Sequence, residues 1–217
     1  MILWLDYETR SACDLPEKGV YNYALHNTTE MLCAAYAFGD EEVQLWWHHE
    51  PIPQRIRDHF ASGDEIRAHN AAFDRLITWH VVCPKYNVPL PPLESWYCTA
   101  SQARSNCAPG SLEDVGRFAS VSMKKDHRGS QLIRMCCVPP FNTDPEILDE
   151  LGQYALQDVR AMRAISQAMR ELSNEELLDY HVNERINDRG VLLDKPLAES
   201  AIKYADRKST RLNSSHT

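Results

Sequence analysis

Residues 2–8 read Ile2-Leu3-Trp4-Leu5-Asp6-Tyr7-Glu8, and this order predicts a buried strand that ends in two carboxylates. Successive side chains of a strand point to opposite faces, and this run is apolar on both, with Trp4 on one and Leu5 on the other. A strand of that kind is typical of the centre of a sheet. Asp6 and Glu8 continue the face of Trp4, so the pattern places two like charges side by side.

Further strands and helices follow along the chain. Period-two patterns predict strands over residues 31–38, 42–47, 65–69 and 96–99, with Gly39-Asp40-Glu41 as a hairpin turn. Helical spacing predicts helices over 52–61, 71–82, the segment after Ser111, 130–137 and 144–172. The proline-rich stretch 84–92 is expected to be irregular. Strands that give way to alternating helices predict an α/β fold with a mixed sheet flanked by helices.

A chain of 217 residues is long enough for one full domain and part of another. Ser173-Asn174-Glu175-Glu176 is a capping-box pattern, which predicts that a new helix starts there. We therefore expect a domain over 1–172 and a short helical extension over 173–208. Residues 209–217 change abruptly to small polar types, which indicates a disordered tail or an artificial or read-through extension.

Composition narrows the class of protein. The net charge of −8 argues against a protein that coats nucleic acid by electrostatic attraction alone. No apolar run approaches the roughly 20 residues needed to cross a bilayer, and the first residues lack the basic leader of a signal peptide. Seven cysteines without a CxxC pair favour a reduced, cytoplasmic setting. Zinc held by Cys98, Cys107 and the pair 136–137 is disfavoured by their spacing.

The helix expected over 144–172 carries a carboxylate within its apolar stripe. The stripe consists of Leu151, Ala155, Met162, Ile165 and Met169. Asp158 falls about 20° from the centre of the stripe, and Tyr154 lies one turn before it on the same side. An unpaired carboxylate in an apolar environment costs several kcal/mol. Asp158 is therefore expected to have a positively charged partner, either a metal ion or the side chain of an arginine.

Asn70-Ala71-Ala72-Phe73-Asp74 supplies a further carboxylate at the start of a helix. Taken alone, Asn70 could be only an N-cap and Asp74 only a favourable first-turn charge. Asp6 and Glu8 could likewise be solvated side chains at the end of a strand. Together, however, four carboxylates from a strand and two helices form the donor set that two-metal phosphodiester chemistry requires. Oxygen donors favour two divalent cations, Mg²⁺ or Mn²⁺, over zinc.

These patterns resemble the three motifs of the tyrosine-bearing branch of the DEDD exonuclease superfamily. The motifs are Asp-x-Glu at Asp6 and Glu8, an asparagine followed four residues later by aspartate at Asn70 and Asp74, and Tyr-x-x-x-Asp at Tyr154 and Asp158. The resemblance implies an RNase H-like fold for residues 1–172. It also implies a 3′→5′ exonuclease that hydrolyses single-stranded DNA ends to nucleoside 5′-monophosphates.

The resemblance implies a role for each of these residues. Asp6, Glu8 and Asp158 would hold the catalytic ion, with Asp6 bridging to the second ion and Asp74 acting largely through bound water. Tyr154 would orient the attacking water. The expected substrate contacts are Asn70, His69, Thr9 and Lys125.

The chain is also similar to the proofreading part of phage-type family A DNA polymerases. The shared stretches are residues 6–11, residues 32–37, Lys125-Asp126-x-x-Gly129-x-x-Leu132-Ile133 and residues 186–191. The last stretch resembles the start of the polymerase module, but the palm carboxylates and the fingers helix have no counterpart, so no polymerase activity is expected from these residues. The implied partners are a single-stranded DNA 3′ end and a polymerase module. The implied location is the cytoplasm of a bacterium, including a phage-infected one.

Two alternatives remain open at this point: an RNA-processing exonuclease with the same motifs, or a non-catalytic domain that supports a polymerase. A basic patch could contact a DNA backbone or could be an ordinary solvated surface. It consists of Lys124, Lys125, Arg128 and Arg134. Three tryptophans could stack on bases, although core packing is the expectation for them. They are Trp46, Trp47 and Trp96.

Overall fold

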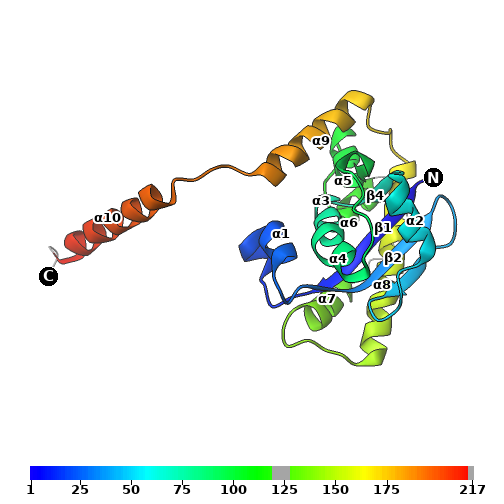
Figure 1. Ribbon diagram of the computed structural model, residues 1–217, viewed down its shortest axis with the longest axis horizontal. Coiled ribbons are helices and arrows are strands. Elements are labelled where there is room, and N and C mark those ends of the chain that lie inside the picture. The colour runs from blue at the N-terminus through cyan, green and yellow to red at the C-terminus, as the bar shows by residue number, and fades with distance from the viewer. Residues whose placement is uncertain (119–127, 215–217) are drawn as a thin grey trace. The chain divides into compact units, whose positions relative to one another are not determined.

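A computed structural model describes residues 1–118 and 128–214 (Figure 1). A five-stranded sheet has the order β3-β2-β1-β4-β5. The strands are β1 (Leu3–Arg10), β2 (Glu30–Phe38), β3 (Gln44–Trp47), β4 (Ile66–Ala68) and β5 (Trp96–Cys98). Strand β2 is antiparallel to both β1 and β3, whereas β1, β4 and β5 are parallel to one another. The mixed sheet confirms the predicted α/β class and is consistent with an RNase H-like fold.

Helices cover both faces of this sheet. They are α1 (Leu15–Leu25), α2 (Gln54–Ser62), α3 (Ala72–Ile77), a π-helix η1 (Thr78–Val82), α4 (Cys83–Tyr86), a 3₁₀-helix η2 (Leu93–Ser95), α5 (Thr99–Ser105), α6 (Leu112–Phe118), α7 (Gly129–Cys137), α8 (Pro145–Gln167), α9 (Asn174–Arg189) and α10 (Lys195–Ser214). Leu5 belongs to the apolar cluster that includes Leu76 of α3. Trp4 belongs to a second cluster, with Met162 of α8. The two faces of β1 are therefore both buried, as its alternation predicts.

Two helical segments differ from the expectations. Helix α1 was not expected, although Asp14 accepts a hydrogen bond from the Glu17 backbone N–H at 2.8 Å and Pro16 lies in the first turn, both of which are helix-start signals. Its pattern is weak because Gly19, at φ 76°, breaks the helical backbone. The expectation that residues 84–92 contain no regular helix is wrong for α4, since Pro84 lies in its first turn, where a missing N–H costs nothing.

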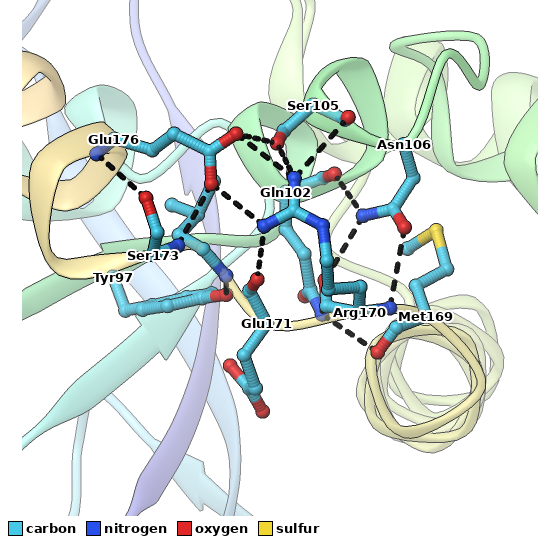
Figure 2. A network of polar contacts seen from close by, with 10 residues as sticks. Tyr97, Gln102, Ser105, Asn106, Met169, Arg170, Glu171, Ser173 and Glu176 are labelled. Atoms are coloured by element: carbon cyan, nitrogen blue, oxygen red, sulfur yellow. Dashed lines mark hydrogen bonds and ion pairs between the residues drawn. The ribbon is translucent and has the colours of Figure 1, made fainter.

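Helix α8 starts where the sequence predicts but ends earlier. The Asp144 carboxylate accepts a hydrogen bond from the Glu146 N–H at 2.9 Å, as expected of its cap. The helix ends at Gln167 rather than at residue 172 because the chain turns away to bind α5 (Figure 2). There the buried Gln102 amide donates to the carbonyls of Ser166, Met169 and Arg170 at 3.0, 3.5 and 3.2 Å. These contacts join the end of α8 to a neighbouring helix.

Helix α9 begins with the predicted capping box. The Glu176 N–H donates to Ser173 Oγ at 3.2 Å, and the Ser173 N–H donates to Glu176 Oε2 at 2.7 Å (Figure 2). Chain contacts divide the protein into residues 1–181 and 182–217, so the division falls inside α9 and not at residue 172. Helix α10 continues through Ser214, whereas a disordered tail or an artificial extension was expected from residue 209. In the part of the chain that is described, no helix has the length and apolar character required to cross a membrane.

Candidate active site

Strand β1 places two carboxylates on the face that α8 covers. Glu8 is only 8% exposed, whereas Asp6 is partly buried. The strand continues to Arg10, with a register shift in its pairing to β2 between Glu8 and Thr9. The alternative that both carboxylates are solvated at a strand end is therefore wrong. Both charges lie within the sheet and require compensation.

Helix α8 brings Tyr154 and Asp158 to the same site. Burial raises the pKa of the Tyr154 hydroxyl, and so do the charge of Asp158 and a hydrogen bond to it. Asp158 is half-buried, and the adjacent Val159 instead takes the fully buried position on the stripe. The carboxylate thus lies at the edge of the apolar stripe rather than in its middle, where it faces Asp6 and Glu8.

Helix α3 supplies the fourth carboxylate. Asp74 is 1% exposed, and its Oδ1 accepts a hydrogen bond from the Tyr7 backbone N–H at 3.1 Å. The backbone N–H of the residue between Asp6 and Glu8 therefore fixes the position of the Asp74 carboxylate. Thr78, the first residue of η1, donates from Oγ1 to the Tyr7 hydroxyl at 3.2 Å. The helix that follows α3 therefore contacts the face of the strand opposite to Asp6 and Glu8.

Asn70 does not cap this helix with its side chain. The N-cap position is Ala71, and no side-chain capping bond is formed there. Asn70 instead has a left-handed backbone with φ 59°, a conformation that asparagine tolerates better than most residues. Its carbonyl accepts the Phe73 N–H at 2.9 Å, and its side chain is exposed. The N-cap interpretation is wrong, and the predicted substrate contact stays a prediction.

The carboxyl groups act on one another electrostatically. Burial, followed by the charge of Asp158, raises the pKa of Asp6 to about 7. Burial and then the charges of Asp6, Asp158 and Asp74 raise the pKa of Glu8 well above its usual value. The pKa of Asp74 is raised by burial and by Asp6, against the lowering effect of the Tyr7 N–H. Four carboxylates from three segments that are far apart in sequence therefore form one acidic site.

The chemistry of this donor set fits Mg²⁺ or Mn²⁺, which prefer oxygen ligands. Among the residues that the structure describes, no ion pair joins Asp6, Glu8 or Asp74 to a lysine, arginine or histidine, and the neighbouring charges that shift their pKa values are those of other carboxylates. Over the same residues, no group of three or more His, Cys, Asp and Glu side chains is already shaped to hold a metal ion. The site thus offers suitable donors without a preformed cage.

A cavity of about 540 Å³ adjoins Glu8. Its walls come from the end of β1, from α1, from Phe73 of α3 and from the C-terminal end of α7, and include Thr9, Tyr23 and Ile133. Thr9 Oγ1 and the Tyr23 hydroxyl are hydrogen-bonded at 2.8 Å. Neither Tyr23 nor Phe73 was predicted to line a site: α1, which carries Tyr23, was not expected, and Phe73 was expected only as an apolar residue of its helix.

The other expected substrate contacts are placed differently. Both ring nitrogens of His69 have protein partners, Thr99 Oγ1 at 3.0 Å and the Gly110 carbonyl at 2.9 Å, so its predicted DNA contact has no support from this arrangement. Lys124 and Lys125 lie outside the described residues, and Arg128 forms an ion pair with Glu150 at 2.8 Å. The tryptophans expected in the core are fully buried at 46 and 96 and half-buried at 47.

No family model matches the chain. A DNA polymerase of Bacillus phage SP02 is 33% identical to it over 219 aligned residues, which cover 92% of this chain. The aligned region is 33% of the polymerase, so the chain spans about a third of the length of the curated relative that it matches. The chain is thus related in sequence to part of a phage DNA polymerase over nearly its whole length.

Proposed function

We propose, from this relationship and from the acidic site, that the chain is a metal-dependent 3′→5′ exonuclease that acts on single-stranded DNA ends. The observation that carries the proposal is the meeting of carboxylates from β1, α3 and α8, whose charges raise one another's pKa values. Buried like charges are costly unless a cation offsets them, and a pair of divalent cations has that effect in phosphodiester hydrolysis. The proposed role is proofreading beside a polymerase module, in the bacterial cytoplasm.

In the proposed reaction, water attacks the phosphorus of the terminal phosphodiester, and the bond from phosphorus to the O3′ of the preceding nucleotide breaks. The products are a nucleoside 5′-monophosphate and a strand one nucleotide shorter with a free 3′-hydroxyl. Asp6, Glu8 and Asp158 would hold the ions, and Asp74, whose carboxylate the Tyr7 N–H orients, would act largely through bound water. When bound, Mg²⁺ or Mn²⁺ supplies activation of the water and stabilisation of the leaving oxygen. The Tyr154 hydroxyl, next to Asp158, orients the water.

The terminal nucleoside is proposed to enter the cavity beside Glu8. Its volume of about 540 Å³ lies within the range of roughly 300–1,000 Å³ that small-molecule pockets occupy. The ring of Phe73 and the apolar side chain of Ile133 line it, which suits a flat, unpaired base. Glu8 is the carboxylate common to the cavity and the acidic site, so a nucleoside in this cavity would have its phosphate near the ions.

The test uses the full chain and a 5′-labelled single strand of DNA in Mg²⁺. A ladder that shortens from the 3′ end, is absent in EDTA and is absent when the 3′-terminal linkage is a phosphorothioate supports the proposal. An RNA strand of the same sequence distinguishes a DNA exonuclease from an RNA-processing enzyme. Faster cleavage of RNA than of DNA would favour an RNA-processing enzyme. If neither strand is digested, the result would favour a non-catalytic domain.

Two substitutions connect the activity to the site. Asp6→Asn and Asp158→Asn keep the side-chain shape but remove a charge, and each is expected to lower the rate by about 100-fold or more. Asp64→Asn is the matched control, since its carboxylate is exposed at the surface beside the amino terminus. If Asp6→Asn digests DNA at the wild-type rate, the proposed site is wrong even when the activity is real.

A further inference from the structure

Gly129, the first residue of α7, lies directly against the ring of Tyr154. A Cβ atom at position 129 would be 2.2 Å from Tyr154 Cε2 and 2.8 Å from both Cδ2 and Cζ. Carbon atoms in van der Waals contact are roughly 3.5–4.0 Å apart, so these distances leave no room for any side chain. Position 129 must therefore be glycine for the ring to lie where it does.

The requirement concerns space and not backbone conformation. Gly129 is not among the glycines with positive φ, so its backbone is open to any residue. Alanine is intrinsically better than glycine inside a helix by about 1 kcal/mol, and local preference alone would therefore favour Gly129→Ala. The contact with Tyr154 opposes that preference, so the effect of the substitution reports on the ring.

The ring of Tyr154 is partly buried by a second set of contacts. It packs against the apolar cluster between α7 and α8, which includes Leu132, Cys136 and Leu151. A methyl group at 129 therefore moves either the tyrosine hydroxyl relative to Asp158 or the start of α7. Both movements act on the hydroxyl assigned to water orientation, and a displacement of 1 Å at such a group can cost about 100-fold in rate.

We propose that Gly129 is a positioning residue for the reaction: its missing side chain sets the place of the Tyr154 ring and thereby of the hydroxyl beside Asp158. The proposal rests on the exonuclease function proposed above. Gly129 itself contacts neither substrate nor ion, and it acts only through Tyr154.

The kinetic test is a double-mutant cycle in the full chain with Gly129→Ala, Tyr154→Ala and the double variant. Gly129→Ala is expected to lower kcat by about 100-fold with little change in KM, because substrate binding does not depend on the hydroxyl. In the Tyr154→Ala background, the same substitution is expected to change kcat by less than about 2-fold, because the clash is gone. Wild-type kcat in Gly129→Ala, or an equal loss in both backgrounds, would overturn the proposal.

Gly152→Ala is the matched control. It also introduces a clash on α8, 2.6 Å from Leu45 Cδ2 and 3.0 Å from a ring carbon of Trp47, but away from Tyr154. Its effect on kcat is expected to be small and the same with or without Tyr154. An effect of Gly152→Ala that also disappears in the Tyr154→Ala background would show that the cycle reports general loosening of α8.

Thermal unfolding separates this inference from the proposed function. Gly129→Ala is expected to lower the melting temperature by about 2–10 °C when Tyr154 is present and to leave it nearly unchanged in the Tyr154→Ala background. An equal decrease in both backgrounds would show that the methyl group meets something other than the ring. If the wild-type chain digests no DNA, the proposed function fails and the positioning role fails with it, while the thermal cycle still decides whether the contact exists.

Discussion

At the scale of single residues, neighbouring groups fix the positions of the side chains that form the acidic site. Asp74 has its position fixed by a main-chain N–H, Tyr154 by the absence of a side chain at Gly129, and Asp6 by the strand itself. The motif spacing predicts which carboxylates matter, and strand alternation predicts the face of Asp6. The contact of Tyr154 with Gly129 and that of Asp74 with the Tyr7 N–H could not be predicted, because each joins segments far apart in the sequence.

Asp6 is expected to make stability depend on pH. Its pKa is raised from 3.8 to about 7 in the folded chain, chiefly by burial and then by Asp158. The folded state therefore binds more protons than the unfolded state between these pH values, and the free energy of unfolding should fall as pH rises from 3.8 through about 7. Urea denaturation in EDTA across this range measures the slope.

Asp6→Asn should make that slope shallower, because the neutral amide has no charge to bury. Mg²⁺ should do the same in the wild-type chain, since a bound cation favours the charged carboxylate. Asp64→Asn, at an exposed carboxylate, serves as the control. Identical slopes for wild type and Asp6→Asn would contradict a raised pKa at this position.

At the scale of elements, the starts of α8 and α9 were predictable from the sequence, whereas the end of α8 was not. Asp144 and the pair Ser173 and Glu176 are local signals, and the structure forms the hydrogen bonds expected of them. The end of α8 at Gln167 depends on the buried Gln102, some 60 residues earlier in the chain. A local pattern holds no information about such a partner, so the helix was expected to continue.

Gln102→Leu tests how strongly this junction supports the fold. The substitution keeps the approximate volume but removes the donor to three carbonyls and the acceptor of the Ser166 hydroxyl, which lies 2.6 Å away. Buried polar groups without partners cost about 1–3 kcal/mol each, so we expect the free energy of unfolding to fall by about 2–4 kcal/mol in urea denaturation. Gln167→Leu removes an exposed amide that donates to Asp40 at the surface, and it should change this free energy by about 0.5 kcal/mol or less. Similar losses of unfolding free energy in the two variants would mean that the hydrogen bonds of Gln102 stabilise the fold no more than an exposed surface contact does.

At the scale of the whole molecule, the apolar clusters and the exposed apolar side chains belong to different stretches of the chain. Every residue of the four described apolar clusters lies within residues 1–181. Between residues 191 and 205, the large apolar side chains are strongly exposed, and they include Val191, Leu192, Leu193, Leu197 and Ile202. The sequence predicted a separate C-terminal segment, although contacts place the division nine residues later than residue 172.

Deletion of residues 191–217 should therefore leave the melting temperature within about 2 °C of the full chain, because the large apolar side chains described at 191–205 are exposed. It should also reduce self-association, since contiguous exposed apolar side chains promote it. Calorimetry and light scattering at matched concentrations measure the two effects. A large fall in melting temperature would show that the segment stabilises the rest of the chain.

The hydrogen bond from the Tyr7 N–H to Asp74 has an evolutionary consequence. The donor belongs to the peptide backbone, which every amino acid except proline supplies. Asp74 can therefore keep its orientation with any residue between Asp6 and Glu8 that donates this N–H and fits the space of the buried Tyr7 side chain. Among functional members of a library randomised at position 7, proline should be absent, and the others should be mainly aromatic or large apolar residues, because the side chain lies in the apolar cluster between β1 and α3.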